Sequence, residues 1–150
     1  MTMGRSSNPQ AVGVKRISSE NLQRIMTESS EEAMKLLVQE ADRLGKELGR
    51  NGLTTSQIRN IFGEVRSIEQ EVLPTDQQLS LDVQRRLLML KPKMAYQVGR
   101  FSNNQALQEL VETLSDAIGL IGNDKNRFQT FVNLFEAILA YHRRYGGKTN

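Results

Sequence analysis

Residues 53–59 read LTTSQIR and form the clearest helix start in the sequence. Thr54 can cap a helix, because its hydroxyl can accept a hydrogen bond from the backbone of Gln57, whose side chain can accept one from the cap in return. Leu53 and Ile58 flank the cap and would pack against each other as a hydrophobic staple. Apolar residues then follow at helical spacing, so this stretch predicts an amphipathic helix rather than a strand.

The helical pattern also precedes this stretch. Between residues 18 and 48, apolar side chains recur at three- and four-residue steps, and Met34 and Val38 belong to that predicted face. Ser29 and Glu32 stand three apart and offer a second capping box. We therefore expect the helix to kink or break near these two residues.

Pro92 interrupts the helical pattern that follows. One helix is predicted from about 76–80 to residue 90. Because proline lacks a backbone donor and disfavours helical geometry in the residue before it, we expect a kink or a short break before a helix over 93–101. Two more amphipathic segments follow, and each ends at glycine. No segment alternates as a strand would, so the sequence predicts an all-α fold, a compact bundle of five to six helices.

The first 17 residues have a different composition. They are rich in Gly, Ser, Asn and Pro and show no apolar period, which predicts a disordered N-terminal arm over 1–17. The remaining residues, 18–150, are expected to form one helical bundle domain, since a chain of 150 residues fits a single domain.

Composition excludes several classes of function. The chain has no cysteine, which excludes disulfides and thiolate chemistry, and one histidine, His142. There is no glycine-rich phosphate loop, no metal-ligand spacing and no long apolar run. We therefore expect no enzyme, no cofactor and no membrane partner, and a cytoplasmic location. We expect His142 to be neutral beside two arginines and to lie at the partly buried edge of the last helix, or to make a minor RNA contact.

The positive charge is unevenly distributed. The formal net charge is +3, and no acidic residue lies between Asp82 and Glu109. A basic block of this kind can attract a polyanion. Within it lie Arg85, Arg86, Lys91, Lys93 and Arg100.

Helical spacing groups some of these residues into candidate RNA contacts. Residues seven apart lie nearly two turns apart and project from one stripe of a helix. Two such stripes occur, and an aromatic side chain between two cations could stack on a base. The alternative is that the charges flank helix–helix seams and pair with nearby carboxylates. The candidate RNA-binding residues are Arg59 and Arg66 on one stripe, Arg86, Lys93 and Arg100 on the other, and the neighbouring Lys91 and Tyr96.

Three blocks of sequence together resemble a known family. They are LTTSQIR at 53–59, LKPKMAY at 90–96 with Arg100, and FEAILAYH at 135–142. In this order and at this spacing they resemble the small α-helical subunit of the type III-A CRISPR–Cas effector, the Csm complex. The resemblance covers roughly residues 53–145.

The resemblance implies a function that composition alone does not. Members of this family are non-enzymatic and stack head to tail in the inner filament of a crRNA-guided complex. It implies crRNA and target RNA as partners, with basic residues facing their backbone, together with the backbone and large subunits of the complex. Self-association, including a dimer of the isolated protein, is also expected. Two alternatives stay open: a helical protein–protein module without RNA contact, and the equivalent small subunit of a type III-B complex.

Overall fold

The computed structural model describes residues 13–101 and 103–147, and within them the fold is all-α, as the sequence predicts. Six helices follow one another along the chain. They are α1 (Ser19–Thr27), α2 (Glu31–Arg50), α3 (Thr55–Glu69), α4 (Leu81–Arg100), α5 (Gln105–Gly119) and α6 (Lys125–Arg144).

Every helix begins with a polar cap. In α3 the predicted capping box is present, since Thr54 accepts from the backbone of Gln57 and the Gln57 side chain accepts from the cap. Leu53 and Ile58 flank it and are fully buried, as expected of a staple. The six N-cap side chains are Ser18, Ser30, Thr54, Ser80, Asn104 and Asp124.

The two expected helix interruptions have different outcomes. The break near Ser29 is confirmed, because α1 ends at Thr27 and α2 begins at Glu31. The alternative of a short break at Pro92 is wrong, because α4 runs through it as one helix. Pro92 lies on the exposed side of α4, as does Leu88 four residues earlier. The backbone carbonyl that loses its helical donor can therefore be hydrated, which lowers the cost of proline at this position.

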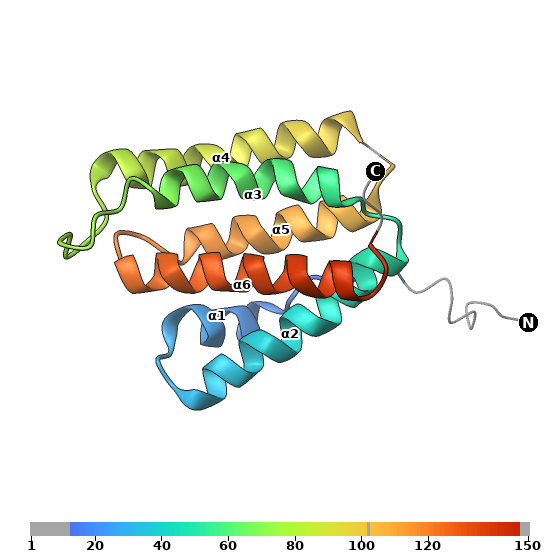
Figure 1. The fold of residues 1–150 in the computed structure, drawn as a ribbon, viewed down its shortest axis with the longest axis horizontal. Coiled ribbons are helices and arrows are strands. Elements are labelled where there is room, and N and C mark those ends of the chain that lie inside the picture. The colour runs from blue at the N-terminus through green and yellow to red at the C-terminus, as the bar shows by residue number, and fades with distance from the viewer. Residues whose placement is uncertain (1–12, 102, 148–150) are drawn as a thin grey trace, which may run out of the picture.

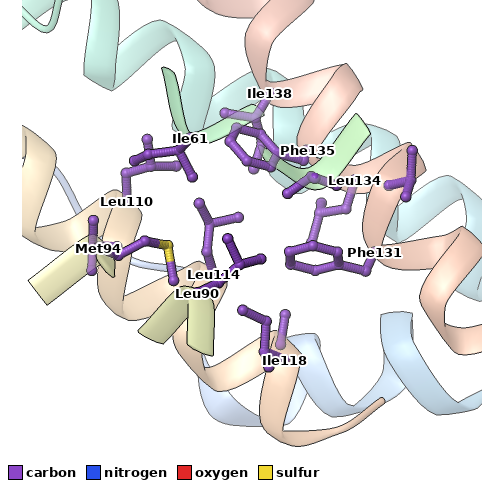
Figure 2. Close-up of a cluster of buried hydrophobic side chains, with 14 of the residues drawn as sticks. Ile61, Leu90, Met94, Leu110, Leu114, Ile118, Phe131, Leu134, Phe135 and Ile138 are labelled. Carbon is purple, nitrogen blue, oxygen red and sulfur yellow. The ribbon is translucent and has the colours of Figure 1, made fainter. Parts of the chain in front are cut away.

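The helices form three layers around one core. Figure 1 shows α3 and α4 along one edge, α5 and α6 in the middle, and α1 and α2 along the opposite edge. Apolar side chains of α3, α4, α5 and α6 meet between the first two layers (Figure 2). Their burial holds α3 and α4 on the rest of the bundle. Labelled there are Ile61, Leu90, Met94, Leu110, Leu114, Ile118, Phe131, Leu134, Phe135 and Ile138.

Helices α2 and α6 touch at a glycine. A Cβ atom at Gly45 would stand 2.7 Å from Cβ of Tyr141 and 2.8 Å from the backbone nitrogen of His142. Gly49, one turn later, also faces α6. Only residues without a side chain allow two helix backbones to approach this closely.

Residues 13–17 correct the expected arm. Residues 1–12 lie outside the described part of the chain, but Val14 and Ile17 are buried in the core. The backbone of Val14 exchanges two hydrogen bonds of 3.1 Å with the side chain of Gln105. Arg16 forms an ion pair with Glu109 at 2.8 Å. For residues 13–17 the disorder prediction is therefore wrong. Side chains of α5, distant in the sequence, supply the hydrogen bonds and the ion pair that hold this segment.

Candidate nucleic-acid interface

The two arginines predicted on α3 have different surroundings. Arg66 donates to Glu69 at 2.8 Å and to Glu136 of α6 at 2.6 Å. Its guanidinium also lies over the Phe62 ring. The hydrogen bond to Glu69 and the nearby carboxylates raise the pKa of Arg66, so its charge is permanent. Arg59 is exposed, and no described carboxylate lies within ion-pairing distance of it.

The three cations of the stripe on α4 also differ in their surroundings. Arg86 pairs with Glu71 and lies 3.9 Å from Glu64 of α3. Lys93 pairs with the same Glu64 at 3.2 Å. Arg100, at the C-terminal end of the helix, has no described carboxylate partner, and its guanidinium lies over the Phe101 ring at 5.6 Å. Two of the three cations thus join α4 to the acidic side chains of α3.

Lys91 and Tyr96 lie on different sides of α4. The Lys91 ammonium approaches α5, because a Cβ at Gly119 would stand 3.6 Å from its Nζ. Tyr96 is 70% exposed. The seven predicted residues therefore do not form one continuous surface, and Arg66, Arg86 and Lys93 already have the seam contacts that the alternative interpretation expected.

Five arginines gather at one end of the bundle, which we call the basic end: Arg50, Arg59, Arg100, Arg143 and Arg144. Each is exposed, and none has a described carboxylate within ion-pairing distance. Figure 1 shows why they converge, since α2, α4 and α6 finish and α3 and α5 begin at the same end.

Two contacts join the elements of the basic end. Arg143 donates to the hydroxyl of Thr55 at 3.4 Å, which places the end of α6 beside the start of α3. Arg100 and Asn51 line the same hollow, of about 630 Å³, which places the end of α4 beside the loop that leaves α2. Unpaired arginines on neighbouring elements create a positive field at this surface.

Three of the five arginines, Arg50, Arg143 and Arg144, are absent from the predicted RNA contacts. A signal for them exists in the sequence. No acidic residue occurs in 48–63, 83–108 or 137–150. Only the fold shows that these three segments meet. Sequence reasoning used the absence of acidic residues in the central segment alone and selected Arg59 by its helical spacing from Arg66.

His142 is completely buried, more deeply than we expected. Its ring Nε2–H donates to the carbonyl of Leu53 at 2.5 Å, and its Nδ1 has no hydrogen-bond partner among the described residues. Burial lowers the pKa of His142, the Leu53 carbonyl opposes that change, and the charge of Arg143 adds to it. The alternative of a minor RNA contact is wrong, because the ring has no exposed surface.

Two other kinds of site were sought in the described residues. They contain no group of three or more His, Cys, Asp or Glu side chains able to hold a metal ion. Among the same residues, no helix is long and apolar enough to cross a membrane.

A family model for the type III-A Csm2 proteins matches residues 31–148, which include α2 through α6. The chain belongs to the Csm2 family. It is thereby a small subunit of the type III-A CRISPR effector, the Csm complex. The type III-B alternative is not supported, since the matching model is the type III-A one.

A curated relative supports the same assignment. This Csm2-family chain is 35% identical, over 118 residues, to a protein of Enterococcus italicus described as "CRISPR system Cms protein Csm2". The alignment covers 73% of this chain and 84% of the relative.

Proposed function

We propose that this Csm2-family chain is a non-catalytic subunit that stacks along the inner filament of the Csm complex and binds the crRNA–target RNA backbone through its basic end. One observation carries the RNA part of this proposal. Three acid-free segments, distant in sequence, bring the five arginines of the basic end to the same end of the bundle. Proteins that track a nucleic-acid backbone present clustered unpaired cations of this kind.

The mechanism is independent of RNA sequence. In a guide-directed complex base pairing reads the sequence, while protein contacts the backbone and the shape of the duplex. Arginines that neutralise phosphates release counterions, so the affinity they supply falls as salt rises. Several copies in one filament would add their contacts through effective concentration, and a net charge of only +3 per chain is then sufficient.

The candidate RNA-binding residues differ in how free they are to contact a phosphate. Arg59 and Arg100 belong both to the sequence prediction and to the basic end. Arg66, Arg86 and Lys93 would have to share or break ion pairs with carboxylates before they could bind phosphate. We therefore assign them mainly to the seams between α3, α4 and α6, and we assign the primary contacts to the basic end.

The test reverses charge at the basic end within the assembled Csm complex. Arg59→Glu and Arg100→Glu, singly and together, should weaken target-RNA capture without disturbing helix content. If each lost contact removes one phosphate per copy, the slope of log affinity against log salt should fall by roughly 0.7–0.9 per contact. Filter binding at several salt concentrations measures both quantities.

Arg24→Glu is the matched control, because Arg24 lies outside the basic end and, among the described residues, pairs with Glu28 at the C-cap of α1 alone. It should leave RNA capture and the salt slope as in the wild type. Unchanged capture by the double variant in a fully assembled complex would contradict RNA binding at the basic end.

The second candidate function is a protein–protein module without direct RNA contact. A specific observation favours a protein contact on a different surface, the outer face of α4, where large apolar side chains are exposed. If the double variant prevented assembly even without RNA, this second function would replace the first.

A further inference from the structure

The outer face of α4 carries apolar side chains that the bundle does not cover. Leu81, Leu88, Met89 and Tyr96 are 74%, 57%, 52% and 70% exposed, and we call them the outer stripe. They lie opposite the buried face of the helix, and the pairs Leu81/Leu88 and Met89/Tyr96 are each seven residues, about two turns, apart. Neighbouring apolar residues exposed together on one helix mark a contact surface more often than scattered single residues do.

A groove runs beside the outer stripe. It lies between α3 and α4, holds about 550 Å³, and has Ile61, Met89, Pro92 and Tyr96 in its walls. Methionine side chains adapt their shape to a partner. The groove could therefore receive a protruding apolar side chain.

The charges on α4 constrain what can dock there. The helix carries five basic residues and one acidic residue, a net charge of +4, and Glu71 and Glu64 offset two of these charges by pairing with Arg86 and Lys93, so an excess of positive charge remains. A second α4 would bring the same charge and be repelled. A favourable partner is apolar and flanked by carboxylates.

This chain carries such a surface at its opposite edge. Met34 and Val38, one turn apart on α2, are 66% and 48% exposed, and we call them the α2 patch. The sequence pattern predicts both on the apolar face of their helix, yet no part of the chain that the structure describes covers them. Residues 28–39 hold three acidic residues and one basic residue, a net charge of −2. Figure 1 places α2 and α4 along opposite edges of the molecule.

We propose that the outer stripe of one copy docks on the α2 patch of a second copy, with Met34 entering the groove beside Met89 and Tyr96. The two surfaces are unlike, so each copy keeps one free surface of each kind and the assembly remains open-ended. This interface specifies which surfaces meet in the stacking part of the proposed function, and it rests on that part. It does not depend on RNA binding.

Two single variants test the proposal in purified protein without RNA. Leu88→Glu disables the outer stripe and Met34→Lys disables the α2 patch, and both sites are exposed enough for the fold to persist. The wild type should associate as concentration rises. Each variant alone should weaken association by an order of magnitude or more, since each removes a buried apolar contact and adds repulsion.

The decisive measurement mixes the two variants. The Leu88→Glu chain retains its α2 patch and the Met34→Lys chain retains its outer stripe, so together they should form a one-to-one dimer that does not elongate. Analytical ultracentrifugation, with circular dichroism as a check on folding, shows whether that dimer forms. The control Leu73→Glu, at a 55% exposed leucine between α3 and α4, should associate as the wild type does.

Other outcomes overturn the proposal. A monomeric wild type at all concentrations would do so, as would Met34→Lys chains that dimerise unaided, because that result indicates α4 pairing with α4. Normal association of Leu88→Glu with weakened target-RNA capture in the complex would assign the outer stripe to RNA instead. Arg59→Glu/Arg100→Glu should associate normally, so failure of RNA binding and failure of this interface are distinguishable.

Discussion

The backbone of Gly147 lies against the buried ring of His142. A Cβ atom added to Gly147 would overlap the ring Cε1, and the Gly147 N–H donates to the His142 carbonyl at 2.8 Å. The ring cannot easily move away, because it also donates to the Leu53 carbonyl. The end of α6 is thereby closed over a histidine that joins it to the loop before α3.

Gly147→Ala should destabilise the protein. The added methyl group must displace the ring or the backbone, and overpacking of this kind costs about 1–3 kcal/mol. Denaturant unfolding measures the loss. In a His142→Ala background the same substitution should cost much less, and equal costs in the two backgrounds would contradict the ring as its cause.

Stability should fall as the pH drops below the ordinary histidine pKa of about 6.5. Burial lowers the pKa of His142 in the folded protein, so the unfolded chain takes up a proton there first. The contribution of His142 is complete above that pH and is progressively lost as the pH falls toward the folded pKa. The measurement is the free energy of unfolding of the wild type and of His142→Gln between about pH 7 and pH 5. The difference between the two proteins removes the contribution of the carboxylates, which both share, and leaves that of His142.

Gly45→Ala and Gly63→Ala should have opposite effects on stability. At Gly45 the new Cβ would meet Tyr141 at 2.7 Å and force α2 away from α6, while at Gly63 it meets nothing within 4 Å. Alanine in an exposed, unobstructed helix position is better than glycine by about 0.5–1 kcal/mol. Thermal unfolding of both variants compares them directly. Equal destabilisation by both would mean that the close contact of α2 with α6 is not the cause.

Lys125→Met should loosen the connection between α3 and α4. The Lys125 ammonium donates to the carbonyls of Leu73, Pro74 and Asp76 at 2.9, 3.1 and 2.9 Å. Methionine keeps the chain length but removes the donor, and because water can reach these carbonyls the cost is about 0.5–1.5 kcal/mol. Hydrogen exchange should quicken in 70–80 and little elsewhere. Lys35→Met, at a surface ion pair with Glu31, is the control and should change exchange little.

Much of the helix arrangement follows from short-range signals in the sequence. Thr54 and Gln57 lie three residues apart, so their capping box could be identified without the fold. The break after Thr27 follows from the same kind of local pattern. Pro92 does not break α4, because the exposure of its side of the helix depends on tertiary packing.

The candidate site was less predictable because its electrostatics are long-range. Arg66 pairs with Glu69 on its own helix and also with Glu136, which lies 70 positions away in the sequence. Charge spacing along one helix cannot reveal such a partner. Likewise, Arg50, Arg100 and Arg143 come to the same end of the bundle only because α2, α4 and α6 end there together.

The strap formed by residues 13–17 has a practical consequence for anyone who labels this protein. Val14 is tied to Gln105 at the start of α5, and Gly147 lies beside His142 near the end of α6. The described chain therefore enters and leaves the bundle at its arginine-rich end. An affinity handle or fluorophore attached close to residue 13 or residue 147 would lie beside the surface whose RNA affinity it is meant to report. A label in the turn around Asn123, at the other end of the molecule, leaves that surface open.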